Sequence, residues 1–187
     1  MKIDYKGGDV TPELFLSVLE GNKTAVNGKG TGRVLDSKPE DNVFMFFSDH
    51  GAPNLIAFPS KYLYADQLLA TFNKMKGKFA KFVFYLETCE SGSMFVNLPK
   101  DTKIYALSAA NPTESSWGTY CSPDDVIQGK HIGTCLGDLF SVSFVENSEE
   151  SDLSGETLQI QFERIRALTT MSHVMQWGDT SFVSDSV

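Results

Sequence analysis

The chain has 187 residues, of which 41% are hydrophobic and 21% are charged, a composition that supports one folded domain with a substantial core. Its formal net charge of -8 argues against a nucleic-acid partner, because phosphate binding requires a basic surface. No apolar run reaches the roughly 20 residues that a membrane-spanning helix needs. The opening residues, MKIDYKGGDVTPELF, also lack the apolar stretch of a signal peptide.

The first forty residues predict one short helix and an irregular loop. Thr11 and Pro12 are typical of a helix start, apolar residues follow at helical spacing, and Gly21 ends the pattern. The glycine-rich stretch at 27–33 follows no strand and lacks a closing Gly-Lys-Ser/Thr, so we interpret it as a surface loop rather than a phosphate-binding loop. Asn22 begins an Asn-Lys-Thr sequon, a glycosylation candidate that matters only if the chain enters the secretory pathway.

The rest of the chain alternates strands and helices. The continuous apolar run at 43–48 predicts a strand buried on both faces of a parallel sheet. Further strands are expected at 55–58, 82–86 and 104–108, and helices at 64–75, 136–147 and 158–168. This order predicts a single α/β domain over residues 1–187, with a largely parallel sheet flanked by helices.

Two of the predicted strands end in residues suited to nucleophilic catalysis. His50 and Gly51 follow the first buried strand, and Cys89 follows the second. Functional groups gather beyond the carboxyl ends of parallel strands, so we expect these residues to meet. The imidazole can act as general base for the thiol, and the N–H groups of Gly51 and Cys89 can bind a developing oxyanion. The pattern predicts a cysteine-nucleophile hydrolase; the alternative is an inert buried thiol beside a polar turn.

Acidic residues flank the predicted nucleophile. Glu87 and Glu90 should disfavour a thiolate, so we interpret them as substrate contacts or as a sign of a low working pH.

The other two cysteines, Cys121 and Cys135, bracket a loop and either form a disulfide or stay reduced. His131 lies between them, but the spacing matches no usual zinc site. We therefore expect no metal and no cofactor.

Several long motifs are recognisable at this point. FFSDHG, FYLETCESGSMF, AANPTESSWGTYC and TCLGDLFSV, with DYKGGDVTPELFLSVLEG and MSHVMQWG towards the ends, closely resemble the legumain family of asparaginyl endopeptidases. The resemblance implies a caspase-like α/β sandwich and hydrolysis of peptide bonds after asparagine, more slowly after aspartate, through an acyl-enzyme. It also implies that His50 and Cys89 form the catalytic dyad and that Gly51 helps to build the oxyanion hole.

The resemblance assigns further roles. Glu87 and Asp138 match the acidic members of a zwitterionic pocket that reads the asparagine amide from both ends. Ser115 and Ser116 match the segment that lines the substrate backbone, and the two loop cysteines match a disulfide of plant-type members. Peptide or protein substrates with asparagine at the cleavage site, and a lysosomal, vacuolar or secreted location, are implied as well.

The sequence departs from the family pattern near its start. Legumains begin with a strand, a helix and a second strand that carries an Asn-x-Arg-His stretch, whose arginine completes the pocket, and residues 1–10 do not supply these elements. We therefore expect a partial catalytic domain that lacks the family's first strands and its C-terminal inhibitory domain. Two alternatives remain: an inactive truncated fragment or degenerate copy, and a glycosylphosphatidylinositol transamidase-type subunit.

Overall fold

A four-stranded sheet forms the centre of the computed structural model, which describes residues 2–152 and 155–187. The strand order is β1-β5-β6-β11; the first three are parallel and β11 runs antiparallel to β6. The strand bounds are Asn42–Ser48, Lys81–Glu87, Ile104–Ser108 and Met175–Gly178, respectively. This confirms the predicted α/β class with a largely parallel sheet, although β11 was not foreseen.

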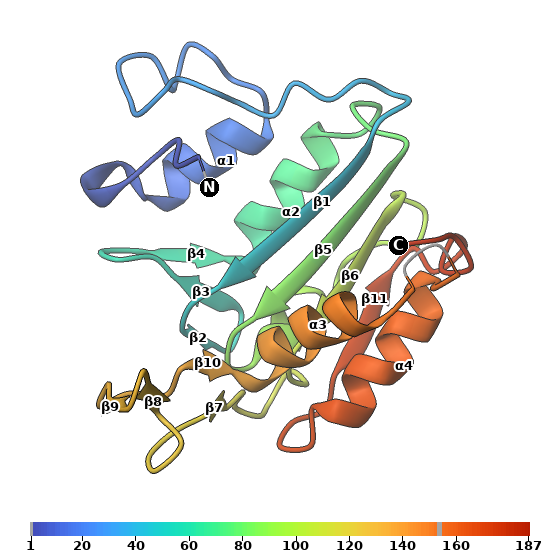
Figure 1. The fold of residues 1–187 in the computed structure, drawn as a ribbon. Helices are drawn as coiled ribbons and strands as arrows, with labels where there is room; N and C mark the ends of the chain where they lie inside the picture. The colour runs from blue at the N-terminus through green and yellow to red at the C-terminus, as the bar shows by residue number, and fades with distance from the viewer. Residues whose placement is uncertain (1, 153–154) are drawn as a thin grey trace.

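Helices cover both faces of this sheet (Figure 1). Helices α1 (Pro12–Leu19) and α2 (Ala65–Lys74) pack on one face, and α3 (Leu139–Glu150) and α4 (Leu158–Leu168) pack on the other. Successive side chains of β5 alternate between the two layers, as the pleat requires. Phe82 and Phe84 join the core beneath α2, whereas Tyr85 joins the core beneath α3 and α4.

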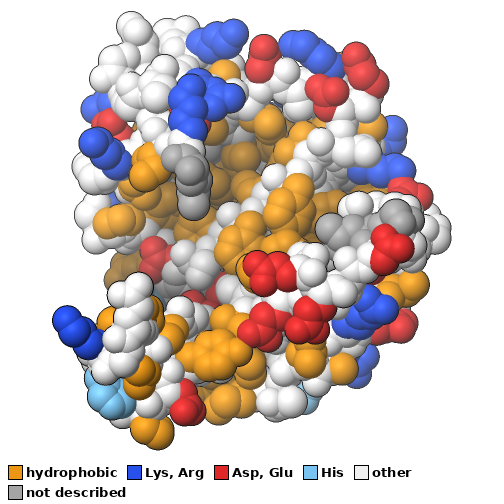
Figure 2. All heavy atoms as spheres, viewed as in Figure 1, with side chains coloured by type: hydrophobic (Ala, Val, Ile, Leu, Met, Phe, Trp, Pro, Cys, Tyr) orange, Lys and Arg blue, Asp and Glu red, His pale blue; other side chains and the backbone are white. Residues whose placement is uncertain are grey.

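Strand β1 is not buried on both faces, so that prediction is wrong. It lies at the edge of the sheet, and its side chains alternate between exposed and half-buried. Phe44 is 53% exposed and Phe46 is 38% exposed, although the ring of Phe144 on α3 lies 5.7 and 5.8 Å from theirs. Figure 2 shows hydrophobic side chains gathered on this face over β1, between α1 and α3.

The predicted helices are present, and α3 is shifted by three residues at both ends. Thr11 caps α1 by accepting a hydrogen bond from Leu14 N at 3.2 Å. The helix predicted at 136–147 begins only at Leu139, because Gly137 and Asp138 form the short strand β10, which pairs with β7 (Gly118–Thr119). The segment at 27–33 is a loop, as predicted.

Short elements complete the fold. A small sheet follows β1 and consists of β2 (Gly51–Ala52), β3 (Leu55–Ala57) and β4 (Tyr62–Tyr64). A hairpin is formed by β8 (Val126–Ile127) and β9 (Lys130–His131), and 3-10 turns occur at η1 (Gly7–Asp9) and η2 (Ser91–Met94). In the described ranges, none of the helices has the length and apolar character needed to cross a membrane.

Candidate active site

The three parallel strands end at one edge of the sheet. Ser48 pairs with Glu87, and Leu86 pairs with Ser108, so the turns that follow β1, β5 and β6 emerge side by side. Backbone hydrogen bonds tie these turns together: Asp49 N donates to Glu87 O at 3.2 Å and Ala109 N donates to Leu86 O at 3.0 Å. The sequence-predicted convergence of the strand ends is therefore present.

Gly51 lies directly against the turn that carries the cysteine. A Cβ atom at Gly51 would lie 2.5 Å from Cys89 O and 2.7 Å from Thr88 Oγ1, closer than a Cβ atom can approach another heavy atom. Glycine is required here for close backbone approach. The neighbouring His50 is exposed, and its carbonyl accepts a hydrogen bond from Ala57 N at 2.8 Å, which fixes its backbone to the small sheet.

Cys89 is half-buried at the start of a sharp turn. The next residue, Glu90, adopts a left-handed conformation with φ of 47°, and η2 begins immediately afterwards. The thiol donates to Ser116 O at a distance of 3.7 Å. A strained turn of this kind presents the side chain that precedes it, and such strain is concentrated at functional sites. The thiol thus faces the segment that the resemblance assigns to substrate binding.

A buried carboxyl group belongs to Glu87, two residues before the cysteine. Glu87 is only 1% exposed, and its Oε2 accepts hydrogen bonds from Ser141 N at 2.8 Å and Ser141 Oγ at 3.0 Å. Burial raises the pKa of Glu87 to about 7, with a further increase from the charge of Asp138; the bonds from Ser141 and the Ser116 hydroxyl oppose this shift. Its Oε1 is buried and has no hydrogen-bond partner among the described residues.

Asp138 acts electrostatically on this carboxyl group, and we call Glu87, Asp138 and Ser116 together the acidic pocket, after the pocket that the resemblance predicts. Asp138 is exposed on β10 and accepts a hydrogen bond from Ser48 Oγ at 3.4 Å. In the part of the chain that the structure describes, neither carboxylate forms an ion pair with a lysine or arginine. Glu87 is buried and Asp138 is exposed, and the role of both in an asparagine pocket stays a prediction.

The remaining predicted residues fall in different places. Ser115 is half-buried on the same loop as Ser116. Cys121 and Cys135 form a disulfide, the pairing that the resemblance implies. Asn22 is exposed in the turn after α1, where its Oδ1 accepts a hydrogen bond from Ala25 N at 3.0 Å. Within residues 2–152 and 155–187, no cluster of His, Cys, Asp and Glu could hold a metal ion.

Two further residues of the candidate site have no signal in the sequence. Ser141 holds Glu87 from the first turn of α3, and Glu114 links the turns around the thiol through hydrogen bonds to Glu90 N and His173. The contacts of Ser141 with Glu87 and of Glu114 with His173 each join segments more than fifty residues apart. In the sequence, Ser141 and Glu114 look like ordinary polar residues of a helix and a loop. No local pattern could have identified them.

Comparison with known proteins places the chain in a family. A model of the Peptidase C13 family matches residues 1–187. The chain belongs to the Peptidase C13 family. Relatives of this C13 chain include legumain from Mus musculus, 47% identical over 180 residues, and vacuolar-processing enzyme from Citrus sinensis, 46% identical over 185 residues. A third is the vacuolar-processing enzyme beta-isozyme 1 of Oryza sativa subsp. indica, 43% identical over 195 residues.

The match to these relatives covers most of the C13 chain but a minor part of theirs. It spans 95% of this chain and 40% of mouse legumain, and 94% of this chain and 37% of the citrus protein. For the rice protein, the values are 98% and 39%. The fold is caspase-like: the structure resembles caspase-1 from Spodoptera frugiperda with a TM-score of 0.59 and 10% identity, over 92% of this chain and 73% of that one.

Proposed function

We propose that this chain carries the catalytic centre of a cysteine endopeptidase that cleaves after asparagine, and more slowly after aspartate. One observation carries the proposal: the backbone of Gly51 lies against Cys89 at the sheet edge where the Glu87 carboxyl is buried. It supports a mechanism in which the Cys89 thiol is the nucleophile, His50 is its base, and the N–H groups of Gly51 and Cys89 bind the oxyanion. The names of two relatives, legumain and vacuolar-processing enzyme, support the same proposal.

The proposed reaction proceeds in two stages. His50 removes the thiol proton, the Cys89 sulfur attacks the substrate carbonyl carbon, and the N–H groups of Gly51 and Cys89 stabilise the oxyanion. The imidazolium then protonates the leaving amine, and water activated by His50 hydrolyses the thioester. The thiol must first leave the Ser116 carbonyl to which it donates here. Such rearrangement is ordinary, because catalytic hydrogen bonds often tighten only with substrate bound.

The acidic pocket supplies the proposed preference for asparagine. We propose that the amide NH2 of an asparagine side chain donates to carboxyl oxygens of Glu87 and Asp138, whereas an ionised aspartate would be repelled by the Asp138 carboxylate. Ser115 and Ser116 would lie along the substrate backbone, where an extended peptide can add to exposed main-chain groups.

We place the working environment of the protein in an acidic compartment, a vacuole or lysosome. The names of the plant relatives point to the vacuole, and the acidic pocket agrees with low pH. Below about pH 7 the buried Glu87 carboxyl is protonated and neutral, which removes one of the charges that would oppose a nearby thiolate. A rate profile that peaks above neutrality would contradict this assignment.

A comparison of Cys89→Ala with the parent tests the proposal. The parent should cleave a peptide with one asparagine and leave the same peptide with glutamine at that position largely intact, while Cys89→Ala should cleave neither. Full activity in Cys89→Ala would refute the assignment of the nucleophile. A folded parent that cleaves no asparagine peptide would instead support the alternative, an inactive copy whose acidic pocket is not paired with a cation.

A further inference from the structure

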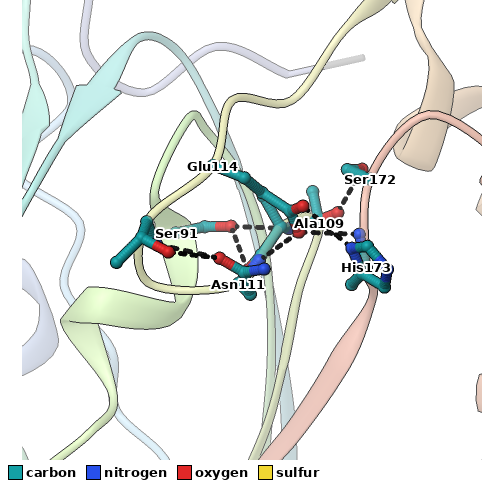
Figure 3. A network of polar contacts seen from close by, with 8 residues as sticks. Ser91, Ala109, Asn111, Glu114, Ser172 and His173 are labelled. Carbon is teal, nitrogen blue, oxygen red and sulfur yellow. Dashed lines mark hydrogen bonds and ion pairs between the residues drawn. The ribbon is translucent and has the colours of Figure 1, made fainter.

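Glu114 ties together three segments around the candidate site. Its Oε1 accepts hydrogen bonds from Asn111 N and His173 N, each at 2.8 Å, and its Oε2 lies 2.8 Å from His173 Nδ1. Its own carbonyl accepts a hydrogen bond from Glu90 N, also at 2.8 Å. Figure 3 shows the Glu114 side chain directed toward Asn111 and His173, which come from the turn after β6 and the segment before β11.

The bonds to Glu114 favour an ionised, fixed carboxylate. Burial acts to raise the pKa of Glu114, but the hydrogen bonds from Asn111 N and from His173 outweigh it, and the pKa is lowered overall. The Glu114 side chain is 24% exposed, whereas that of His173 is 79% exposed. The two backbone N–H groups are therefore the stronger part of the linkage, since an exposed ion pair contributes little.

A second set of bonds extends the linkage to the turn that carries the cysteine. Ser91 is fully buried; its Oγ accepts a hydrogen bond from Ala110 N at 3.0 Å and donates to Ala110 O at 3.3 Å. Gly92 N donates to the same carbonyl at 3.1 Å. A side chain at Gly92 would collide with Pro112 N and Ala110 O, at 2.9 and 3.0 Å. The cysteine turn and the turn after β6 are thus held as one unit.

The position of Glu114 in the chain links this unit to Cys89 and to the Ser115–Ser116 segment. Glu90, whose N–H it accepts, follows Cys89 directly and holds a left-handed conformation. Ser115 and Ser116 follow Glu114 directly, and the Ser116 carbonyl accepts a hydrogen bond from the Cys89 thiol. A shift of Glu114 would therefore move the nucleophile relative to the segment that lines the substrate.

We propose that Glu114 is a positioning residue: its carboxylate, held by Asn111 N and His173 N, sets the distance between the Cys89 thiol and the Ser115–Ser116 segment. The proposal rests on the proposed function for its catalytic consequence, and it deepens that function by naming what aligns the site. His173 acts through its backbone N–H more than through its imidazole. Neither residue is catalytic, because neither touches the reacting atoms.

Three variants separate this role from a general loss of stability. Glu114→Ala removes the acceptor of both N–H groups and should lower kcat/KM about 100-fold, the typical cost of a misplacement of about 1 Å. Glu114→Gln keeps an acceptor oxygen of the same reach and should stay within about five-fold of the parent. His173→Ala keeps the backbone N–H and should behave like Glu114→Gln. Glu40→Ala, an exposed glutamate just before the opposite end of β1, is the matched control and should match the parent.

The comparison of Glu114→Gln with Glu114→Ala is decisive, because a general loss of stability would not spare kcat/KM in the glutamine variant alone. A folded Glu114→Ala variant with parental kcat/KM, or a Glu114→Gln variant as impaired as Glu114→Ala, would overturn the proposal. If Glu114→Ala does not fold, Glu114→Asp takes its place with the same expectation, since its carboxylate stops one methylene short.

Failure of the proposed function is distinguished by measurements that need no peptide substrate. Hydrogen exchange at the Asn111 and His173 amides, and the rate of Cys89 alkylation by iodoacetamide, should both change in Glu114→Ala and remain parental in Glu114→Gln. Unchanged exchange and alkylation in Glu114→Ala would refute the positioning role even if the parent cleaves nothing.

Discussion

Replacing Glu87 with glutamine should change how stability depends on pH. In the folded protein, burial raises the pKa of Glu87 from 4.5 to about 7. The folded state therefore binds the proton more tightly than the unfolded state, so Glu87 adds most stability at low pH, and this contribution is lost as the pH rises through about 7. Glutamine has nearly the same shape and no charge at any pH, so Glu87→Gln should lack this dependence.

The size of the effect follows from the two pKa values. At about 1.36 kcal/mol per pKa unit, the difference between 4.5 and about 7 corresponds to roughly 3 kcal/mol of unfolding free energy. Most of this falls between about pH 5 and about pH 8.5. Relative to the parent, Glu87→Gln should therefore gain roughly 2 to 3 kcal/mol of stability over that interval.

Urea denaturation at both pH values measures this difference. The hydrogen bonds from Ser141 favour the ionised carboxylate and lower the pKa of Glu87, so their effect is already contained in the net value of about 7. Glu40→Gln, at an exposed position, is the matched control and should run parallel to the parent. Parallel curves for the parent and Glu87→Gln would refute the buried, raised-pKa state of Glu87.

Three other changes test the surroundings of the thiol. Gly51→Ala should lower kcat/KM for peptide cleavage by at least about 100-fold, because the added Cβ would lie 2.5 Å from Cys89 O and must displace an oxyanion donor. A parental kcat/KM would disprove the close approach. Changing both disulfide cysteines, which are 14 residues apart, to serine should cost up to about 3 kcal/mol by thermal unfolding, and no loss would contradict the role of the loop closure. The double variant Phe44→Thr, Phe46→Thr should reduce the concentration-dependent self-association of the protein in light scattering, because the edge strand β1 exposes both rings. Unaltered self-association would show that β1 does not form the contact between copies.

The sheet edge that carries the candidate site could be predicted because its signals are local. The apolar runs of β5 and β6 are long enough to identify as strands, and parallel strands must end at the same edge. The placement of Cys89 then followed from its position just after β5.

Other features depend on contacts that no local pattern records. The apolar run of β1 looks like that of a central strand, yet its position at the edge leaves one face partly open. The half-buried residues of β11 show no alternation, so only pairing with β6 defines the strand. The hydrogen bonds from Ser141 to Glu87 and from His173 to Glu114 likewise exist only once distant segments have packed.

In the proposed reaction, Cys89 attacks a carbonyl placed by an asparagine pocket. The most direct test of this attack is labelling of the parent with two matched peptides that carry an electrophile in place of the scissile bond, one with asparagine before it and one with glutamine. Mass spectrometry should find one adduct per chain, on the proteolytic fragment that contains Cys89, formed faster with the asparagine peptide. Labelling at another residue, or equal rates for the two peptides, would contradict the account.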